Sequence, residues 1–321
     1  MVTALASLAL CASAQAGIVT VGSLATETQK PAGLGTTLTM FNAALGDPKA
    51  NVTSPVTGTI VRWHVRGFSG GPFRLRVLTP LGGQSYLASG TSGPATPLSL
   101  GPETFPASLP IKAGQTIAVD NTNPTDLVSL AASGASAYDY FAPPLADGAS
   151  GTSAGPFNGV EFAFYAEVLP LPGVSVISPT AGSIAGGTVV SIAGSEFAEV
   201  TGVRFGAAPA TLYSVDSAGL IKAVAPPSAT PGPVAVTVTT SAGTTAAGAG
   251  STFTYTACVV PKLAGKKLKG AKKRIRKGGC RVGKVNRPKG VTAKTGVVVK
   301  QNPKAGKILT PGAKVNVKLG T

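Results

Sequence analysis

Five basic side chains in the first half of the chain are spaced so that they could bind an anion. Arg62, His64 and Arg66 alternate along one predicted strand, and Arg74 and Arg76 alternate along the next. Alternate residues of a strand project to the same side. The short, glycine-rich connection between the two runs predicts a hairpin, which would bring both sets onto one surface. This spacing indicates a patch for an anionic glycan or a phosphate, with a solvated sheet face as the alternative.

Groups suited to catalysis are sparse. His64 is the only histidine, and it lies in an arginine-flanked strand rather than in a loop where it could act as the base for a serine nucleophile. Paired carboxylates could hydrolyse a glycosidic bond, but no motif pairs the candidates Asp120, Glu161 and Glu167. We therefore expect a protein that is not an enzyme and has no cofactor. A secreted hydrolase with a catalytic N-terminal sandwich is the alternative.

Metal ligation is also poorly supported. Residues 120–126 (DNTNPTD) offer several oxygen ligands for Ca²⁺, but their spacing does not match a calcium-binding loop, and Asx-rich turns occur between strands for their own hydrogen bonding. Zinc sites generally need four thiolate or imidazole ligands, and the single histidine is remote in sequence from Cys258 and Cys280. We expect no metal site.

Positive charge is concentrated at the C-terminus. The chain carries a formal net charge of +16, and residues 257–321 hold 19 lysines and arginines with no aspartate or glutamate. Residues 17–170 and 171–256 are each slightly acidic. Such a density of cations favours an anionic partner. Nucleic acid is not expected, because residues 257–321 contain no aromatic side chain on which a base could stack.

The first 16 residues predict secretion. An apolar stretch is followed by small residues at Ala12, Ala14 and Ala16, the pattern of a signal peptide and its cleavage site. A truncated start would explain the missing positive charge at its beginning. The rest of the chain has no apolar run of the about 20 residues that a transmembrane helix needs. Outside the cell, Cys258 and Cys280 are plausible disulfide partners, and closing their loop would contribute roughly 3 kcal/mol.

Composition and turn residues predict a mainly β fold. The 42 glycines and 26 prolines argue against long helices, and a hydrophobic content of 43% is enough for buried cores. Residues 17–170 lack helical periodicity and predict a jelly-roll-like β-sandwich. In residues 73–77 (FRLRV) apolar residues alternate with arginines, which predicts that the arginines face outward. The expected strands are Gly35 to Phe41, Gly58 to Arg66, Phe73 to Leu78, Gln115 to Asp120, Leu127 to Ala132 and Gly159 to Val168.

A proline-rich segment, Pro170 to Gly173, marks the start of a second domain at 171–256. The sequence segments that characterise this domain are VISPTAGS (176–183), GGTVVSIAGSEF (186–197), VRFG (203–206), VAPP (224–227), GPVAVTV (232–238) and FTY (253–255). This domain resembles the IPT/TIG family of immunoglobulin-like domains. The resemblance implies a β-sandwich that serves as a spacer or as an interaction module, without catalytic residues.

Residues 257–321 predict one helix followed by strands. Leu268, Ala271 and Ile275 recur at helical spacing among basic residues, and Gly278 with Gly279 would end the helix. The segment resembles a PASTA domain, which implies a small α+β fold that contacts uncrosslinked peptidoglycan stems or β-lactams. The resemblance is carried by VPKL (260–263), Gly265, Leu268, Ala271, Ile275, Gly278, VGKV (282–285), Val297, QNP (301–303), Gly306, Leu309, Gly312 and VNV (315–317).

The basic surface of this last domain is the expected contact with the cell wall. A solvated, solubilising surface is the alternative. The candidate contact residues are Lys262, Lys266, Lys269, Lys273, Arg276, Lys300, Gln301 and Asn302. The sequence therefore predicts a secreted, cell-wall-associated binding protein. Its partners would be peptidoglycan or other anionic wall polymers, with a glycan or a protein as a further ligand of the N-terminal sandwich.

Overall fold

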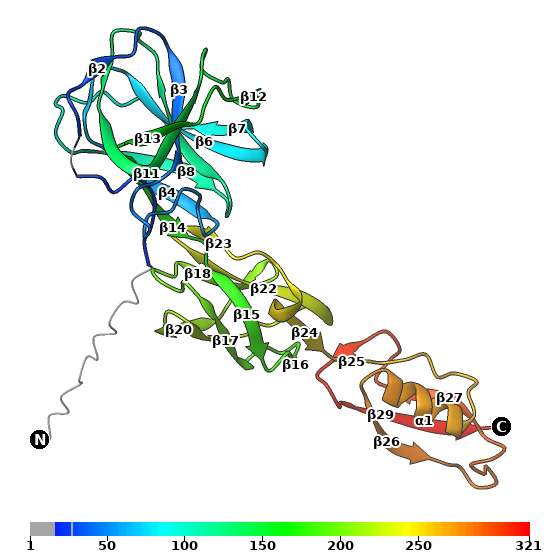
Figure 1. The fold of residues 1–321 in the computed structure, drawn as a ribbon. Helices are drawn as coiled ribbons and strands as arrows, with labels where there is room; N and C mark the ends of the chain where they lie inside the picture. The colour runs from blue at the N-terminus through cyan, green and yellow to red at the C-terminus, as the bar shows by residue number, and fades with distance from the viewer. Residues whose placement is uncertain (1–16, 27) are drawn as a thin grey trace, which may run out of the picture. The chain divides into compact units, whose positions relative to one another are not determined.

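The computed structural model describes residues 17–26 and 28–321, so the predicted signal peptide at 1–16 lies outside the described residues. The described part is mainly β, as the sequence predicts, and contains a single α-helix. None of its helices is long and apolar enough to span a membrane. The chain divides between Leu171 and Pro172 into two compact units, and Figure 1 labels most of their elements.

The first unit is built from two facing sheets. One has four strands in the order β1 (Val19–Gly22), β14 (Phe164–Pro170), β4 (Gly58–Val65) and β8 (Glu103–Ile111). The other has seven, in the order β12 (Ser150–Thr152), β7 (Ser85–Thr91), β6 (Phe73–Gly82), β9 (Thr116–Asn121), β3 (Leu38–Ala44), β11 (Leu130–Phe141) and β13 (Phe157–Phe162). A small third sheet joins β2 (Ala32–Gly33), β10 (Leu127–Val128) and β5 (Phe68–Ser69).

The strand order of this unit is that of a jelly roll. Taken along the chain, the eight strands concerned are β1, β3, β4, β6, β7, β8, β9 and β14. If these strands are numbered 1 to 8 in chain order, the four-stranded sheet has the order 1-8-3-6 and the other sheet contains the order 5-4-7-2. Such an arrangement of interlocked Greek keys defines the jelly roll. The predicted fold class is confirmed, and β11 and β13 are additions that extend the larger sheet beyond β3.

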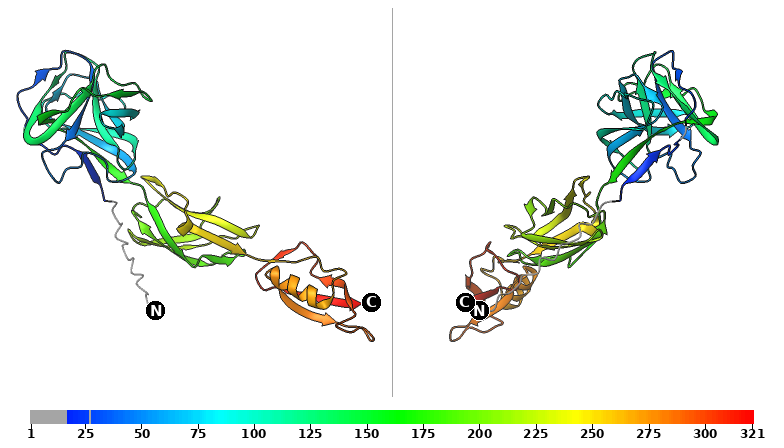
Figure 2. Two further views of the ribbon diagram at one scale, coloured as in Figure 1. Left: turned by 45° about the vertical axis from the view of Figure 1, so that its right-hand side comes forward. Right: turned by 90° about the vertical axis from the view of Figure 1, so that its left-hand side faces the viewer.

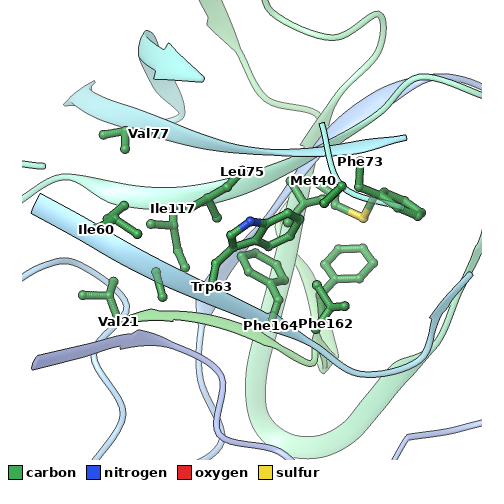
Figure 3. Close-up of a cluster of buried hydrophobic side chains, with 14 of the residues drawn as sticks. Val21, Met40, Ile60, Trp63, Phe73, Leu75, Val77, Ile117, Phe162 and Phe164 are labelled. Atoms are coloured by element: carbon green, nitrogen blue, oxygen red, sulfur yellow. The ribbon is translucent and has the colours of Figure 1, made fainter. Parts of the chain in front are cut away.

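The core lies between the two sheets (Figure 3). Trp63, Met40 and Phe164 are completely buried there, and the Trp63 ring lies 5.3 Å from the ring of Phe105. The pairing of β4 with both of its neighbours is irregular between Ile60 and Arg62. A bulge of this kind shifts the alternation by one residue, so Ile60 and Trp63 both reach the core although they are three positions apart.

Two differences from the predicted strands have clear physical reasons. The predicted strand Gly159 to Val168 is interrupted at Ala163, because the chain passes there from β13 in one sheet to β14 in the other. Strand β8 was not predicted, because Pro106 and Pro110 argue against a central strand. It lies at the edge of its sheet and pairs with β4 alone, so it tolerates residues without an N–H group.

The first part of the second unit is an immunoglobulin-like sandwich. One sheet has the order β15 (Gly173–Ser178), β17 (Val189–Ser195), β21 (Leu220–Val224) and β20 (Leu212–Ser217). The other has β16 (Ala181–Ser183), β24 (Thr252–Thr256), β22 (Gly232–Thr240), β18 (Gly202–Phe205) and β19 (Ala208–Pro209), with β23 (Gly243–Thr244) on β22 and a 3₁₀ turn at Ala249–Ser251. Gly186 has φ +78°, and a Cβ there would lie 2.7 Å from the backbone nitrogen of Pro227. Only glycine fits this turn.

The last part of the chain packs helix α1 (Leu268–Lys277) on a three-stranded sheet, as Figure 2 shows. The sheet has the order β26 (Arg281–Asn286), β29 (Lys314–Gly320) and β27 (Val297–Asn302), and β25 (Cys258–Val259) pairs separately with β28 (Ile308–Leu309). Leu268, Ala271 and Ile275 are the buried residues of the helix, as predicted.

The end of helix α1 is fixed by a glycine turn and a disulfide. Gly279 adopts φ +74°, its N–H donates to Arg276 O, and the Cys280 N–H donates to Ile275 O. These two bonds form a Schellman motif, so the predicted helix stop is confirmed. Cys280 follows at once and is joined to Cys258 by the predicted disulfide.

Candidate functional site

The basic residues of the N-terminal unit do not gather on one surface. β4, which carries Arg62 and His64, belongs to the four-stranded sheet, and β6, which carries Arg74 and Arg76, belongs to the seven-stranded sheet. The predicted hairpin between them is wrong, because the glycine-rich connection carries the chain from one sheet to the other. Arg66 lies just after β4, where the chain begins this crossing.

Arg62 and His64 share one carboxylate instead of presenting free charges. The Glu167 carboxylate, from the neighbouring strand β14, lies 2.8 Å from Arg62 Nε and 2.9 Å from His64 Nε2. The His64 ring also stacks on Tyr165, with 4.2 Å between ring centroids. Partial burial raises the pKa of the Glu167 carboxyl, but hydrogen bonds and positive charges from Arg62 and His64 outweigh that effect, so its pKa lies below the ordinary value.

This carboxylate makes stability dependent on pH. A carboxyl whose pKa is lower in the folded than in the unfolded state stabilises the fold above its ordinary pKa, and the contribution disappears as the pH falls through the folded value. We expect Glu167→Gln to lower the free energy of unfolding of the N-terminal unit by about 1–2 kcal/mol at pH 7. The loss should shrink below about pH 4.5 and vanish in stronger acid.

Urea unfolding of both proteins, followed by Trp63 fluorescence between pH 7 and pH 3, measures this difference. Arg62→Gln serves as the matched variant, since it removes a partner of the same carboxylate and should reduce the same pH dependence. A difference between wild type and Glu167→Gln that stays constant down to pH 3 would contradict the assignment.

Arg76 is buried, which corrects the prediction that both arginines of β6 face outward. Its side chain is 6% exposed, and its guanidinium lies 2.7 Å from Asp120 and 2.5 Å from Asp147. The outer face of the sheet is covered here by a second small core that includes Phe41, Leu78 and Phe141. Arg74 is half-buried, with its guanidinium 3.3 Å from the carbonyl of Ser92. The alternation of apolar and basic residues correctly predicts that β6 has two different faces. It cannot predict that other side chains cover both of them.

The candidate catalytic carboxylates are each held by their own donors. Glu161 accepts hydrogen bonds from Ser23 Oγ and the Gly46 N–H, both at 2.6 Å. Asp120 binds Arg76 and accepts from Thr39 Oγ1 at 2.6 Å, and Glu167 binds Arg62 and His64. In the 120–126 loop, Asp126 Oδ1 accepts from the Gly71 N–H at 2.7 Å. Across residues 17–26 and 28–321, no cluster of three or more His, Cys, Asp or Glu side chains could hold a metal.

The C-terminal domain presents its charge without compensation. All 19 lysines and arginines of residues 257–321 are exposed, and none belongs to an ion pair formed by the described residues. Because the domain contains no aspartate or glutamate, its positive field can be neutralised only by ions or by a bound anion.

One depression in this surface brings cations next to apolar groups. We call it the cationic cleft, and its volume is about 590 Å³. Helix α1 forms one side and the chain around β25 the other. The lining residues are Val259, Pro261, Gly270, Lys273, Arg274, Lys277 and Gly278. Val259 is 40% exposed in it, so the cleft offers an apolar contact beside three positive charges.

The cleft suits a carboxylate or phosphate that carries an apolar part. Lys273 belongs to the predicted contact set, but Arg274 and Lys277 do not, because the predicted residues Lys269, Lys273 and Arg276 follow the neighbouring side of the helix. Their spacing contained the signal: residues 270, 273, 274 and 277 lie on one side of a helix. Gly270 has no side chain and leaves that side open beside Lys273 and Lys277.

The remaining predicted contact residues are distributed around the domain. Lys262, Lys266, Lys269, Arg276, Lys300 and Asn302 are exposed and do not line the cationic cleft. Gln301 has a structural role: its Oε1 accepts from the Leu263 N–H at 2.9 Å, and its Nε2 donates to the carbonyls of Pro261 at 3.0 Å and Pro303 at 3.2 Å. It therefore holds the segment before helix α1 against β27.

Comparison with known families agrees with this architecture. Residues 172–255 match the IPT/TIG domain and residues 259–321 match the PASTA domain, which confirms both resemblances seen in the sequence. The N-terminal region has no family match. A comparison of the whole chain with curated proteins found no match.

Proposed function

We propose that this protein is a non-enzymatic, cell-wall-associated binding protein that is held on anionic wall polymers by its C-terminal domain. The observation that carries the proposal is the set of 19 exposed, unpaired cations on a domain without acids. PASTA domains are known to bind peptidoglycan-related ligands, and PASTA and IPT/TIG domains together fit a binding or spacer role at the wall.

The physical basis is multivalent electrostatic attraction centred on the cationic cleft. Peptidoglycan stem peptides end in carboxylates, and wall phosphates repeat along a polymer, so one chain can meet several cations at once. Each exposed pair contributes little alone, but linked contacts add without a further loss of translational entropy. The apolar contact at Val259 and Pro261 gives the cleft a preference for peptide stems over simple ions.

The proposal includes export of the chain. The apolar stretch of residues 1–16 would act as a signal peptide, and a disulfide between Cys258 and Cys280 is typical of proteins that mature in an oxidising space. The immunoglobulin-like domain would act as a spacer, since it is a β-sandwich with its own core of apolar and aromatic side chains. The absence of enzymatic activity is favoured by the donors that hold Asp120, Glu161 and Glu167.

Salt provides the direct test. Ionic screening shortens the Debye length from about 20 Å at 20 mM salt to about 4 Å at 500 mM. We expect the full chain to sediment with purified peptidoglycan at 20 mM NaCl, and its affinity to fall about tenfold at 500 mM. A chain that ends at Thr256 is the control and should stay in the supernatant at both concentrations.

Two outcomes would overturn the proposal. Equal sedimentation of the full and shortened chains would place wall binding outside the C-terminal domain. Release of soluble sugar or peptide fragments from the wall during the incubation would favour the secreted hydrolase over a binding protein.

A further inference from the structure

The N-terminal jelly roll contains an uncharged cleft that the proposed wall contact does not use. We call it the aromatic cleft, and its volume is about 290 Å³. It lies between the inner face of β3, β11 and β13 and the segment that includes β2 and β10. Its side chains are Leu34, Leu38, Leu130, Tyr138, Tyr140 and Phe162, together with smaller groups from residues 32, 33, 36 and 128.

The cleft exists because the larger sheet extends beyond the eight strands of the jelly roll. Strands β11 and β13 continue the seven-stranded sheet past β3, whereas the facing sheet has only four strands. Tyr138 and Tyr140 of β11 pair with Asn42 and Met40 of β3, so they face the same side as the buried Met40. They pack at the margin of the main core and remain half-buried.

Three aromatic rings, those of Tyr138, Tyr140 and Phe162, line this cleft, and the ring of Phe157 packs against both tyrosines without lining it. The Phe157 ring stacks on Tyr138 at 5.2 Å and on Tyr140 at 5.6 Å, with interplanar angles of 22° and 15°. Phe162 meets Tyr138 edge to face at 5.0 Å. Phe157 is 40% exposed, although an isolated core would bury such a ring. Phe157 therefore covers one side of each tyrosine and holds the two rings in place, and a ligand in the cleft would meet the parts of these rings that line it.

The hydroxyl groups of the cleft are not used by the fold. Neither the Tyr138 nor the Tyr140 hydroxyl makes a hydrogen bond to another residue in the described part of the chain. Burial, with a smaller contribution from Tyr140, raises the pKa of Tyr138, so its hydroxyl is protonated at neutral pH. Tyrosine combines an apolar ring with a polar tip that usually finds a partner when it is covered. A ligand that covers these rings should therefore supply hydrogen-bonding groups.

The lining also excludes classes of ligand. No charged residue lines the cleft, so an anion or a cation would lose its hydration without compensation. A hydrocarbon chain would fit the rings but would leave the tyrosine hydroxyls covered and unpaired, which is costly. A saccharide ring has apolar C–H faces and a rim of hydroxyls, and it matches both features. The volume lies at the lower end of the range for small-molecule sites, which suits one or two sugar rings.

We propose that the aromatic cleft binds a neutral saccharide, with its rings stacked on Tyr138 and Tyr140 and its hydroxyls bonded to the tyrosine hydroxyls. This site differs from the predicted arginine patch in place and in chemistry. It would give the protein a second contact with glycans, one that does not depend on charge.

The test uses the full chain in 500 mM NaCl, where binding through the cationic cleft is weakened. Calorimetric titration with cellotriose, maltotriose, mannotriose and tri-N-acetylchitotriose should show saturable binding of at least one of them. Tyr138→Phe with Tyr140→Phe keeps both rings and removes both hydroxyls, and it should weaken that binding about tenfold. Phe157→Ala should weaken it severalfold. Leu98→Ala, at a residue that is 89% exposed in the same unit, should leave it unchanged.

Three results would overturn this proposal. They are binding of none of the four sugars, binding that the double tyrosine variant leaves intact, and binding of laurate at this cleft in place of a sugar. Each result is independent of wall sedimentation at low salt, which depends on residues 257–321. Failure of the saccharide site and failure of the proposed wall contact can therefore be distinguished.

Discussion

Replacing Lys273, Arg274 and Lys277 together by glutamate is expected to weaken binding to purified peptidoglycan about a hundredfold. The change removes three attractions to wall anions and introduces three repulsions at the same positions. At about 0.5 kcal/mol for each exposed pair, the six effects amount to about 3 kcal/mol, which corresponds to two orders of magnitude in affinity. Sedimentation at a series of protein concentrations in 20 mM NaCl measures this loss.

A second triple variant separates the cationic cleft from the general charge of the domain. Lys284, Lys289 and Lys294 are exposed and do not line the cleft, so replacing them by glutamate changes the net charge by the same amount. We expect this control to lose at most about tenfold in affinity, through the weaker long-range field. Equal losses in both variants would contradict a specific role for the cleft.

Folding of the cleft variant needs its own check. Acidic residues in the last turn of a helix oppose the helix dipole by a few tenths of a kcal/mol or more, and Arg274 and Lys277 lie in that turn of α1. A glutamine version of the triple change removes the attractions without adding acids. It should lose about tenfold in affinity, while the helix loses only about 0.3–1 kcal/mol for each cation removed near its C-terminus.

The two C-terminal domains could be predicted from sequence because their determinants are local. Glycines such as Gly186 and Gly279 mark turns that only glycine can make. The spacing of Leu268, Ala271 and Ile275 defines the buried side of a short helix without information from elsewhere in the chain. The C-terminal end of helix α1 and the disulfide were also predicted from this short segment.

The N-terminal unit could be predicted only as a class, because its contacts join distant parts of the chain. Strand composition and turns predicted a jelly roll, but the arginine patch assumed that neighbours in sequence are neighbours in a sheet. Glu167 meets Arg62 across 105 residues, and Asp120 meets Arg76 across 44. No short sequence pattern can predict partners that are so far apart in the chain. The aromatic cleft was missed for the same reason, since Phe157 reaches Tyr138 only through the pairing of β11 with β13.

Removing the disulfide by Cys258→Ala and Cys280→Ala is expected to destabilise the C-terminal domain by about 3 kcal/mol. The bond closes a loop across a sequence separation of 22 residues, and the chain-entropy relation gives this value for such a loop. Both sulfurs are buried, and Cys258 is completely so. A loss of about 3 kcal/mol should raise the equilibrium constant for unfolding by more than a hundredfold. The effect matters because a domain of some 60 residues has a small free energy of unfolding.

Amide hydrogen exchange measures this change, because residues 257–321 contain no aromatic side chain to report on unfolding. Protection should fall throughout residues 258–321 of the variant and of reduced wild-type protein alike. Urea unfolding followed by Trp63 fluorescence is the internal control and should not change, since Trp63 belongs to the core of the other unit. Unchanged protection in residues 258–321 would contradict a stabilising role for the bond.

The same variant tests whether wall binding needs the folded cleft or only its charge. Val259 and Gly278 line the cationic cleft and lie within the loop that the disulfide closes, one residue after Cys258 and two residues before Cys280. Unfolding would therefore disperse the cleft while leaving all 19 cations in the chain. We expect the unfolded domain to keep a weak attraction to the wall that salt removes, and to lose the tighter binding that Lys273, Arg274 and Lys277 provide. If the variant has lost its protection throughout residues 258–321 and yet binds as tightly as the wild type, charge density alone accounts for retention and the cleft does not.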